Sequence, residues 1–246
     1  MKSGWSEEIY HQALLKQLLK HNIPTLSKPR FPIIHRGKEV YQFEPDIIVW
    51  DEIILELKVN RNFKGREFPS INEAQIIHYL KCCKKELGIL VNFAHTKVGI
   101  KRMIYHPPEI KLVEVYDHIK SKINNHDRSI LKEVRKHLLN ISHQYGTGYS
   151  DTVYRNIIEL ELNYHGLKYK DNVIAHAEWE GERIGSHEIP HLLVEDRILV
   201  LIRASFKHGS TLDFTSMQSY LNALDLNIGI VMNFGRDNIQ INGVAV

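Results

Sequence analysis

Two carboxylates and one ammonium group stand close together in the first half of the sequence. Asp46 is followed after nine residues by Glu56-Leu57-Lys58, and mostly β-branched apolar residues surround these positions. Such runs predict short buried strands, in which charged side chains require a partner or a metal ion. Carboxylate oxygens on neighbouring strands are the ligands that Mg²⁺ prefers. The pattern therefore predicts a site for a hard divalent cation.

A cation at this place would suit the hydrolysis of a phosphate ester. Bound Mg²⁺ activates a water molecule as a nucleophile and offsets the charge that builds on the phosphorus. Lys58 would orient the attacking water or stabilise the transition state, and both roles stay open. In the plainer interpretation, Asp46 caps a turn while Glu56 and Lys58 form a surface ion pair.

The turn between the two strands decides whether the acids can meet. Side chains alternate between the two faces of a strand, so Asp46 and Glu56 share a face only when the register places them opposite one another. A two-residue turn at Asp51-Glu52 would instead pair Asp46 with Leu57 and separate the acids. We therefore expect a turn with an odd number of residues, or a β-bulge.

The sequence contains two copies of one unit. Residues 4–10 read G-x-x-E-x-x-Y, and residues 148–154 read G-x-x-D-x-x-Y. Matched blocks in the same order indicate a tandem duplication. The further matched blocks are 46–58 with 191–203, and 87–93 with 228–234.

Apolar spacing predicts the same order of elements in each copy. In the first copy we expect a helix, a strand or hairpin, two apolar strands, a second helix and a final strand. Their approximate bounds are 4–21, 30–43, 46–50, 53–59, 71–85 and 88–93. Apolar residues at helical spacing between 127 and 145 predict a further packed helix. The chain thus divides into a first copy, a helical connector and a second copy, at residues 1–106, 107–146 and 147–246.

The residues that could do chemistry belong to an ordered series along the first copy. The series consists of Gly4, Glu7 and Tyr10, then Asp46, Glu56 and Lys58, then Glu73, Gln75 and Tyr79, then residues 88–93, and finally Lys101 and Arg102. In this order it resembles the PD-(D/E)XK nuclease superfamily, and specifically its bacterial group named after the motif GxxExxY. Glu-x-Lys alone is a weak signal, whereas the whole series is specific.

The resemblance implies an α/β fold of the restriction-endonuclease type, with a mixed sheet flanked by helices and duplicated in tandem. It also implies a nuclease that cuts nucleic acid with Mg²⁺ or Mn²⁺. By position, Asp46 and Glu56 would be the metal ligands, and Lys58 would lie on the side of the catalytic base.

Three further residues of the first copy take a role from the resemblance. Glu7 would be the additional acid that many of these folds carry, while Gln75 and Tyr79 would form a Q-x-x-x-Y pattern at the active site, on one helix face. Each also has a simpler interpretation: Glu7 as an acid favoured by the helix dipole, Gln75 as a surface amide and Tyr79 as a half-buried ring. Asn92-Phe93 recurs in both copies, which favours a structural role at the strand end.

The second copy has lost the polar residues of the site. The replacements are His191 for Asp46, Leu201 for Glu56, Arg203 for Lys58, Phe214 for Glu73 and Ser216 for Gln75. A leucine cannot ligate Mg²⁺, and one histidine does not make a site for a hard cation. The second copy is either a stabilising half without a ligand or a pseudo-dimer lobe that offers basic side chains to the substrate. The candidates for such contacts are Arg203, Lys207, His208 and Arg236.

Composition gives weaker constraints. The 246 residues carry a net charge of +3 and a pI near 8.7, which is compatible with a polyanionic partner. No run approaches the ~20 apolar residues that a membrane helix needs, and the cysteines are the neighbours Cys82 and Cys83. We therefore expect a cytoplasmic protein without membrane contact, either a monomer with an internal pseudo-dimer or a homodimer.

Three functions are compatible with these features. The leading hypothesis is a Mg²⁺-dependent nuclease with its active site in residues 1–106, for which DNA is favoured over RNA as the substrate. The second is a catalytically inactive nucleic-acid-binding or protein-interaction module of the same fold, because a fold alone does not establish activity. The third is a metal-dependent hydrolase of small phosphate compounds. The intact Asp46, Glu56 and Lys58 favour an enzyme.

Overall fold

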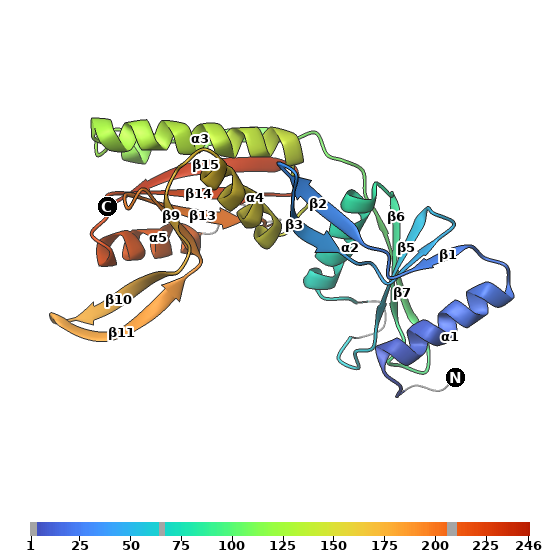
Figure 1. The fold of residues 1–246 in the computed structure, drawn as a ribbon. Helices are drawn as coiled ribbons and strands as arrows, with labels where there is room; N and C mark the ends of the chain where they lie inside the picture. The colour runs from blue at the N-terminus through green and yellow to red at the C-terminus, as the bar shows by residue number, and fades with distance from the viewer. Residues whose placement is uncertain (1–3, 64–66, 206–210) are drawn as a thin grey trace. The chain divides into compact units, whose positions relative to one another are not determined.

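The chain divides after Pro107 into two units, Met1–Pro107 and Pro108–Val246. The structure is a computed structural model that describes residues 4–63, 67–205 and 211–246. Each unit contains a sheet with helices on both sides (Figure 1). Among the described residues, no helix combines the length and the apolar character needed to cross a membrane.

The first unit is built around a mixed sheet. Its described elements are α1 (Glu7–Lys20), β1 (Thr25–Ser27), β2 (Phe31–His35), β3 (Lys38–Phe43), β4 (Ile47–Val49), β5 (Ile53–Lys58), α2 (Ser70–Cys83), β6 (Leu87–Asn92) and β7 (Gly99–Ile104). The sheet has the order β1-β4-β5-β6-β7, in which β5 and β6 are parallel and the other neighbours are antiparallel. β2 and β3 form a separate hairpin.

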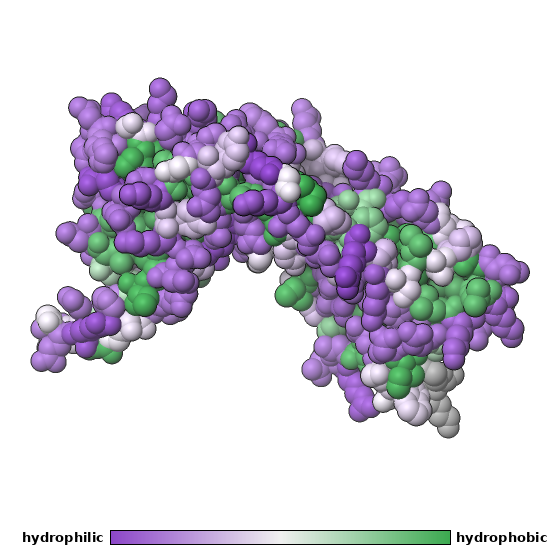
Figure 2. Space-filling view, in the orientation of Figure 1, coloured by the Kyte–Doolittle hydropathy of each residue, from purple (hydrophilic) through white to green (hydrophobic). Residues whose placement is uncertain are grey.

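The second unit has a larger sheet. Its described elements are β8 (Lys111–Val115), η1 (Asp117–Ile119), α3 (Asn125–Tyr145), α4 (Asp151–Tyr164), β9 (Tyr169–Lys170), β10 (Val173–Trp179), β11 (Glu182–Ile189), β12 (His191–Val194), β13 (Ile198–Arg203), α5 (Thr211–Ala223), β14 (Ile228–Phe234) and β15 (Asn238–Ala245). The strand order is β8-β15-β14-β13-β12-β9, and β10 and β11 form a hairpin. This hairpin extends away from the rest of its unit (Figure 1), and its surface is mostly hydrophilic (Figure 2).

The two units share one topology. The order β9-β12-β13-β14-β15 repeats the order β1-β4-β5-β6-β7, and the parallel pair stands at the same place in both. The matched helices α1 and α4 are each tied to a strand end by stacked rings, Tyr10 on Phe93 and Tyr154 on Phe234, with centroids 4.8 and 3.5 Å apart. The predicted fold class is therefore confirmed, and the repeated topology supports a tandem duplication.

Residues 108–146 belong to the second unit. Strand β8 pairs in parallel with β15, and α3 packs against α4 and β13. The helix between 127 and 145 is thus present as predicted, but the segment adds a strand and a helix to one sheet instead of only joining two copies. The apolar side of α3 explains this placement, because Ile130, Val134, Leu138 and Ile141 are all buried.

This added segment buries a face that is open in the first unit. Ile100 pairs with Val91 across β6 and β7, and Ile241 pairs with Met232 at the matched place in β14 and β15. Ile100 is 48% exposed, whereas Ile241 is 0% exposed. The difference arises because η1 lies against β15, and the first unit has no counterpart of η1 and α3 among its described residues.

The core of the first unit lies on both sides of its sheet. Leu14, Leu15 and Leu18 of α1 pack on a cluster formed by Ile47, Val49, Leu57 and Val91. Helix α2 packs on the other side, where Gly88 permits close approach of Ile76. Alternation along a strand therefore turns Asp46, Glu56 and Lys58 to the side of α2. The candidate site is set between the sheet and this helix.

Candidate active site

A three-residue turn aligns the two strands that carry the acids. Ile47 pairs with Leu55 and Val49 with Ile53, so residues 50–52 form the turn. Trp50 and Asp51 have φ values of 53° and 56°, and the amide of Glu52 donates to the carbonyl of Val49 at 3.0 Å. Two consecutive residues with positive φ suit the right-handed twist of a hairpin. The predicted odd turn is confirmed.

Asp46 lies immediately before β4 and opposite β5. Its Oδ2 accepts a hydrogen bond from the main-chain amide of Leu57 at 2.7 Å. Its main-chain carbonyl accepts from the amide of Lys28 at 2.9 Å. Asp46 is therefore fixed on the strand pair from both sides, and its interpretation as a simple turn cap does not hold.

Glu56 and Lys58 form a buried ion pair. Lys58 Nζ donates to Glu56 Oε1 at 2.6 Å, and the two side chains are 18% and 3% exposed. Glu56 Oε2 is buried and has no hydrogen-bond partner among the described residues. The two residues thus do not form the surface ion pair of the plainer interpretation, because a surface pair would leave both carboxylate oxygens in water.

Burial makes Glu56 hard to ionise. It raises the pKa of Glu56 to about 7, and the Asp46 carboxylate acts in the same direction while the Lys58 ammonium opposes it. A buried carboxylate beside a second carboxylate, with one unpartnered oxygen, is an arrangement that a divalent cation stabilises. The residues present therefore fit a hard divalent cation, which Asp46 and Glu56 could hold.

Glu7 reaches the same place from the first turn of α1. The main-chain amide of Val59 donates to its carboxylate. Partial burial of the carboxyl group raises its pKa, the Lys58 ammonium opposes this rise and the Asp46 carboxylate reinforces it. The structure thus brings Glu7 close to Lys58 and Asp46. An acid that only interacts with the helix dipole would not need this proximity.

Gln75 and Tyr79 face the acids from α2. Gln75 Nε2 donates to Tyr79 Oη at 2.9 Å, and Tyr79 is buried. Burial raises the pKa of Tyr79, and the carboxylates of Glu56 and Asp46 reinforce this, which places the hydroxyl near both acids. All six residues selected from the sequence are therefore brought together around β5.

Two contacts around the site could not be predicted from the sequence. Glu73 of α2 forms an ion pair with Lys101 of β7, which ties the helix to the sheet. Asn92 binds the loop after β5: its Oδ1 accepts from the amide of Asn60 at 3.0 Å, and its Nδ2 donates to the carbonyl of Asn60 at 2.9 Å. Asn233 makes the same pair of bonds to Ser205 in the second unit. The recurrence of this asparagine was the signal for its structural role.

The second unit fills the matched place with groups that do not suit a hard cation. His191 pairs directly with Leu201 across β12 and β13. Arg203 forms an ion pair with Asp213 at 3.1 Å, so the carboxylate of Asp213 is neutralised. Burial, reinforced by Arg203, lowers the pKa of His191 to about 4, which leaves the ring neutral near pH 7. Of the other proposed contacts, Arg236 is exposed, and Lys207 and His208 lie outside the described residues.

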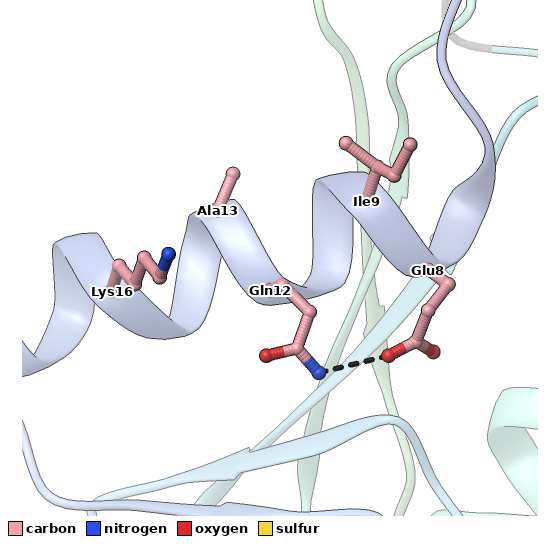
Figure 3. Close-up of a pocket in the computed structure, with 5 residues that line it drawn as sticks. All are labelled: Glu8, Ile9, Gln12, Ala13 and Lys16. Atoms are coloured by element: carbon pink, nitrogen blue, oxygen red, sulfur yellow. Dashed lines mark hydrogen bonds between the residues drawn. The ribbon is translucent and has the colours of Figure 1, made fainter.

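A shallow hollow on α1 is separate from this site. Glu8, Ile9, Gln12, Ala13 and Lys16 line it along one side of the helix (Figure 3). Gln12 Nε2 donates to Glu8 Oε1 across it at 2.8 Å. Its lining includes none of the six candidate residues, so the hollow is not part of their site.

The sequence pattern of the PD-(D/E)XK nuclease superfamily matches residues 1–103 and 128–243. The chain belongs to this superfamily. The two matched segments fall in the two structural units, and the residues between them include β8 and η1. The strand that closes the second sheet therefore lies outside the pattern of the PD-(D/E)XK superfamily.

Solved structures with detectable similarity are distant. The match to the crystal structure of SSO0001 has 26% sequence identity and a TM-score of 0.32. It covers 39% of this chain and 48% of the chain of SSO0001. The crystal structure of the alkaline exonuclease LHK-Exo from Laribacter hongkongensis is 11% identical, with coverages of 65% and 69% and a TM-score of 0.34. The chain thus spans about half the length of the first of these. No curated protein matches the sequence.

Proposed function

We propose that this chain is a Mg²⁺- or Mn²⁺-dependent nuclease that hydrolyses phosphodiester bonds of nucleic acid, with DNA favoured, at a site in the first unit. One observation carries the proposal. In a member of a nuclease superfamily, Asp46, Glu56 and Lys58 share one buried face, and Glu56 keeps an oxygen without a hydrogen-bond partner among the described residues. The second unit, in which this set is replaced, serves as the internal control.

Each acid has one oxygen fixed by a protein donor. The Leu57 amide holds Asp46, and the Lys58 ammonium holds Glu56. This leaves the remaining carboxylate oxygens to bind the cation, which when bound polarises the phosphate and lowers the pKa of a water molecule. Because Glu56 lies on β5 and Asp46 is bonded to β5 through the Leu57 amide, the separation of the acids is preorganised before substrate binds.

The other residues act on the water and the phosphate. Lys58 lies beside Glu56 and would orient the attacking water or stabilise the charge of the transition state. Glu7 adds a third carboxylate to the edge of the site, where it would accept a hydrogen bond from the water. Gln75 and Tyr79 would position the substrate from α2. We propose that the chemistry is confined to the first unit, and that the second unit is a pseudo-dimer lobe or a stabilising half.

Cleavage assays with matched variants test this proposal. The purified full chain is incubated with linear duplex, single-stranded and branched DNA and with RNA, in Mg²⁺, Mn²⁺ or chelator. We expect Asp46→Asn and Glu56→Gln to lower the cleavage rate by at least ~100-fold, the size of loss that follows removal of one strong electrostatic group. The paired variants Lys58→Met and Arg203→Met compare the same position in the two units.

The outcomes separate the hypotheses. Lys58→Met should lose activity while Arg203→Met keeps it, provided that circular dichroism shows both variants folded. Cleavage that survives both acid substitutions would come from a contaminant and would overturn the assignment. Tight binding of DNA without cleavage under any metal condition would instead favour the inactive binding module.

A further inference from the structure

A second cluster of ligand-type side chains lies in the second unit, between α3 and α4. Glu161 Oε1 is 3.4 Å from His137 Nδ1 and 3.2 Å from His165 Nε2. The three ligand atoms all lie within 4.8 Å of one another. The proposed nuclease chemistry uses none of these residues.

Helical spacing explains why the three groups meet. Glu161 and His165 are four residues apart at the end of α4, so they lie on one face, one turn from each other. His137 projects from α3, which packs against α4. The cluster therefore joins the added helix to the first helix of the duplicated unit.

Two of the three groups are buried, and one ring nitrogen of the buried histidine has no hydrogen-bond partner within the described part of the chain. The side chains of His137 and Glu161 are 3% and 4% exposed, and His137 Nδ1 has no hydrogen-bond partner among the described residues. His165 is 33% exposed and gives the cluster a side open to solvent. The buried nitrogen of His137 points at the buried carboxylate of Glu161, and the third group, His165, is reached by solvent. A cation site with an entry path requires such an arrangement.

The distances suit a tetrahedral ion. Zinc bonds of ~2.0–2.1 Å to nitrogen and oxygen imply separations of about 3.4 Å between ligand atoms in a tetrahedron. Both distances to Glu161 are near this value. The two imidazole rings are stacked with centroids 4.0 Å apart, so the exposed His165 has to turn to bring its nitrogen closer to that of His137. Rotation of an exposed side chain requires no change in the helices.

A further carboxylate stands behind the buried histidine. Glu133 Oε2 is 4.0 Å from His137 Nε2, on the ring edge opposite the nitrogen that faces Glu161. A carboxylate at the distal nitrogen orients a metal-bound imidazole and increases its basicity. Two imidazoles and one carboxylate favour Zn²⁺ over the hard cations that we assign to the first unit.

From this juxtaposition we propose that His137, Glu161 and His165 form a Zn²⁺ site that fastens α3 to α4. The matched positions of the first unit are Gln17 and His21, both exposed, and the described part of that unit has no counterpart of α3. The site is thus a property of the second unit alone. It gives this unit a metal-dependent stability that is independent of nucleic acid cleavage.

Metal titration of the full chain tests the site. Asp46→Asn and Glu56→Gln are introduced together to remove the first-unit ligands, and Zn²⁺ or Co²⁺ is added to chelator-treated protein. We expect one equivalent to bind by calorimetry, visible absorption bands of tetrahedral Co²⁺, and a higher melting temperature with Zn²⁺. His165→Ala should weaken binding at least ~10-fold, because it removes one of three protein ligands.

Controls keep the result interpretable. His21→Ala changes the matched position in the first unit and should leave Zn²⁺ affinity, Co²⁺ spectrum and melting temperature unchanged. Glu161→Gln tests the carboxylate, and circular dichroism shows whether this buried variant folds. Because His165 is partly exposed, we expect its variant to remain folded, which circular dichroism checks, so its Zn²⁺ binding decides the case. An absence of Zn²⁺ binding, or binding unaffected by His165→Ala, would show a hydrogen-bonded cluster only and overturn the proposal.

Discussion

Asp46 Oδ2 accepts a hydrogen bond of 2.7 Å from the main-chain amide of Leu57. The bond links the residue before β4 to the strand that carries Glu56 and Lys58. Leu57 is 0% exposed, so its amide has no water to replace this acceptor. Asp46 therefore has a structural role in addition to its proposed role as a metal ligand, and the two can be separated by substitution.

Two substitutions of Asp46 should both abolish cleavage but should differ in the free energy of unfolding. Asp46→Asn keeps an oxygen that can accept from Leu57, so the free energy of unfolding should change little while cleavage is lost. Asp46→Ala leaves the buried amide unpaired and should lower the free energy of unfolding by about 1–3 kcal/mol. Denaturant unfolding and cleavage assays on both variants check this. Equal stability of the two variants would contradict the structural role.

Gly88 is the second position where substitution should reach the site. A Cβ added there would lie 2.6 Å from Ile76 Cδ1 and 2.7 Å from Ile76 Cγ1. Ile76 is β-branched and buried, so it cannot simply move aside. Gly88→Ala should destabilise the chain by about 1–3 kcal/mol. It should also reduce cleavage, because α2 carries Gln75 next to Ile76.

Gly185 in β11 is the matched control for this change. A Cβ there meets no described atom within 4 Å. Gly185→Ala should leave the thermal melt and the cleavage rate unchanged. If Gly88→Ala were equally harmless, the close approach of α2 to β6 would not set the position of the helix.

Acid should destabilise the second unit through His191. Its folded-state pKa, about 4, lies below the ordinary value of 6.5 because the ring is buried beside Arg203. The unfolded chain therefore takes up this proton first as the pH falls. The contribution of neutral His191 is fully present above pH 6.5 and is lost progressively down to about 4. The total loss is on the order of 3 kcal/mol.

Comparison of pH profiles checks this expectation. His191→Leu removes the titrating group. The free energy of unfolding of the variant, relative to that of the natural chain, should therefore increase as the pH is lowered from neutrality. A constant difference between His191→Leu and the natural chain across this range would refute the burial argument.

The paired asparagines offer a prediction that compares the two units. Asn92→Ala and Asn233→Ala each remove two hydrogen bonds to a loop after the central strand. Both should lower the free energy of unfolding, by about 2 kcal/mol each. Only Asn92→Ala should also slow cleavage, because its loop follows Lys58. A loss of cleavage in Asn233→Ala with the fold intact would implicate the second unit in the chemistry.

The sequence predicted those features that follow from local periodicity. The parity of side chains along a strand required an odd turn between Asp46 and Glu56, and the structure has one. Apolar spacing located α3 and most elements of the first unit, but not β1 and β7. Side-chain parity and apolar spacing operate within a few residues of the chain, so they can be read without knowing the distant pairings.

Features that depend on distant pairing were not predictable in this way. Strand β8 joins the edge of β15, more than a hundred residues away, and its short exposed sequence has no pattern that identifies this partner. The ion pair of Arg203 with Asp213 and the cluster of His137 with Glu161 and His165 depend in the same way on how helices pack. Helical spacing predicts which residues share one face of a helix, but it does not predict which other element packs against that face.

The turn at residues 50–52 recurs at residues 195–197, where Glu195 and Asp196 also have positive φ and the amide of Arg197 bonds to the carbonyl of Val194. Deleting one residue from either loop would exchange inward and outward side chains along the following strand. In the first unit this would part the acids. In the second unit it would exchange the side chains that face α5 for those of the opposite side of the sheet. Loop length is therefore under constraint in both halves, for chemical reasons in one and for packing reasons in the other.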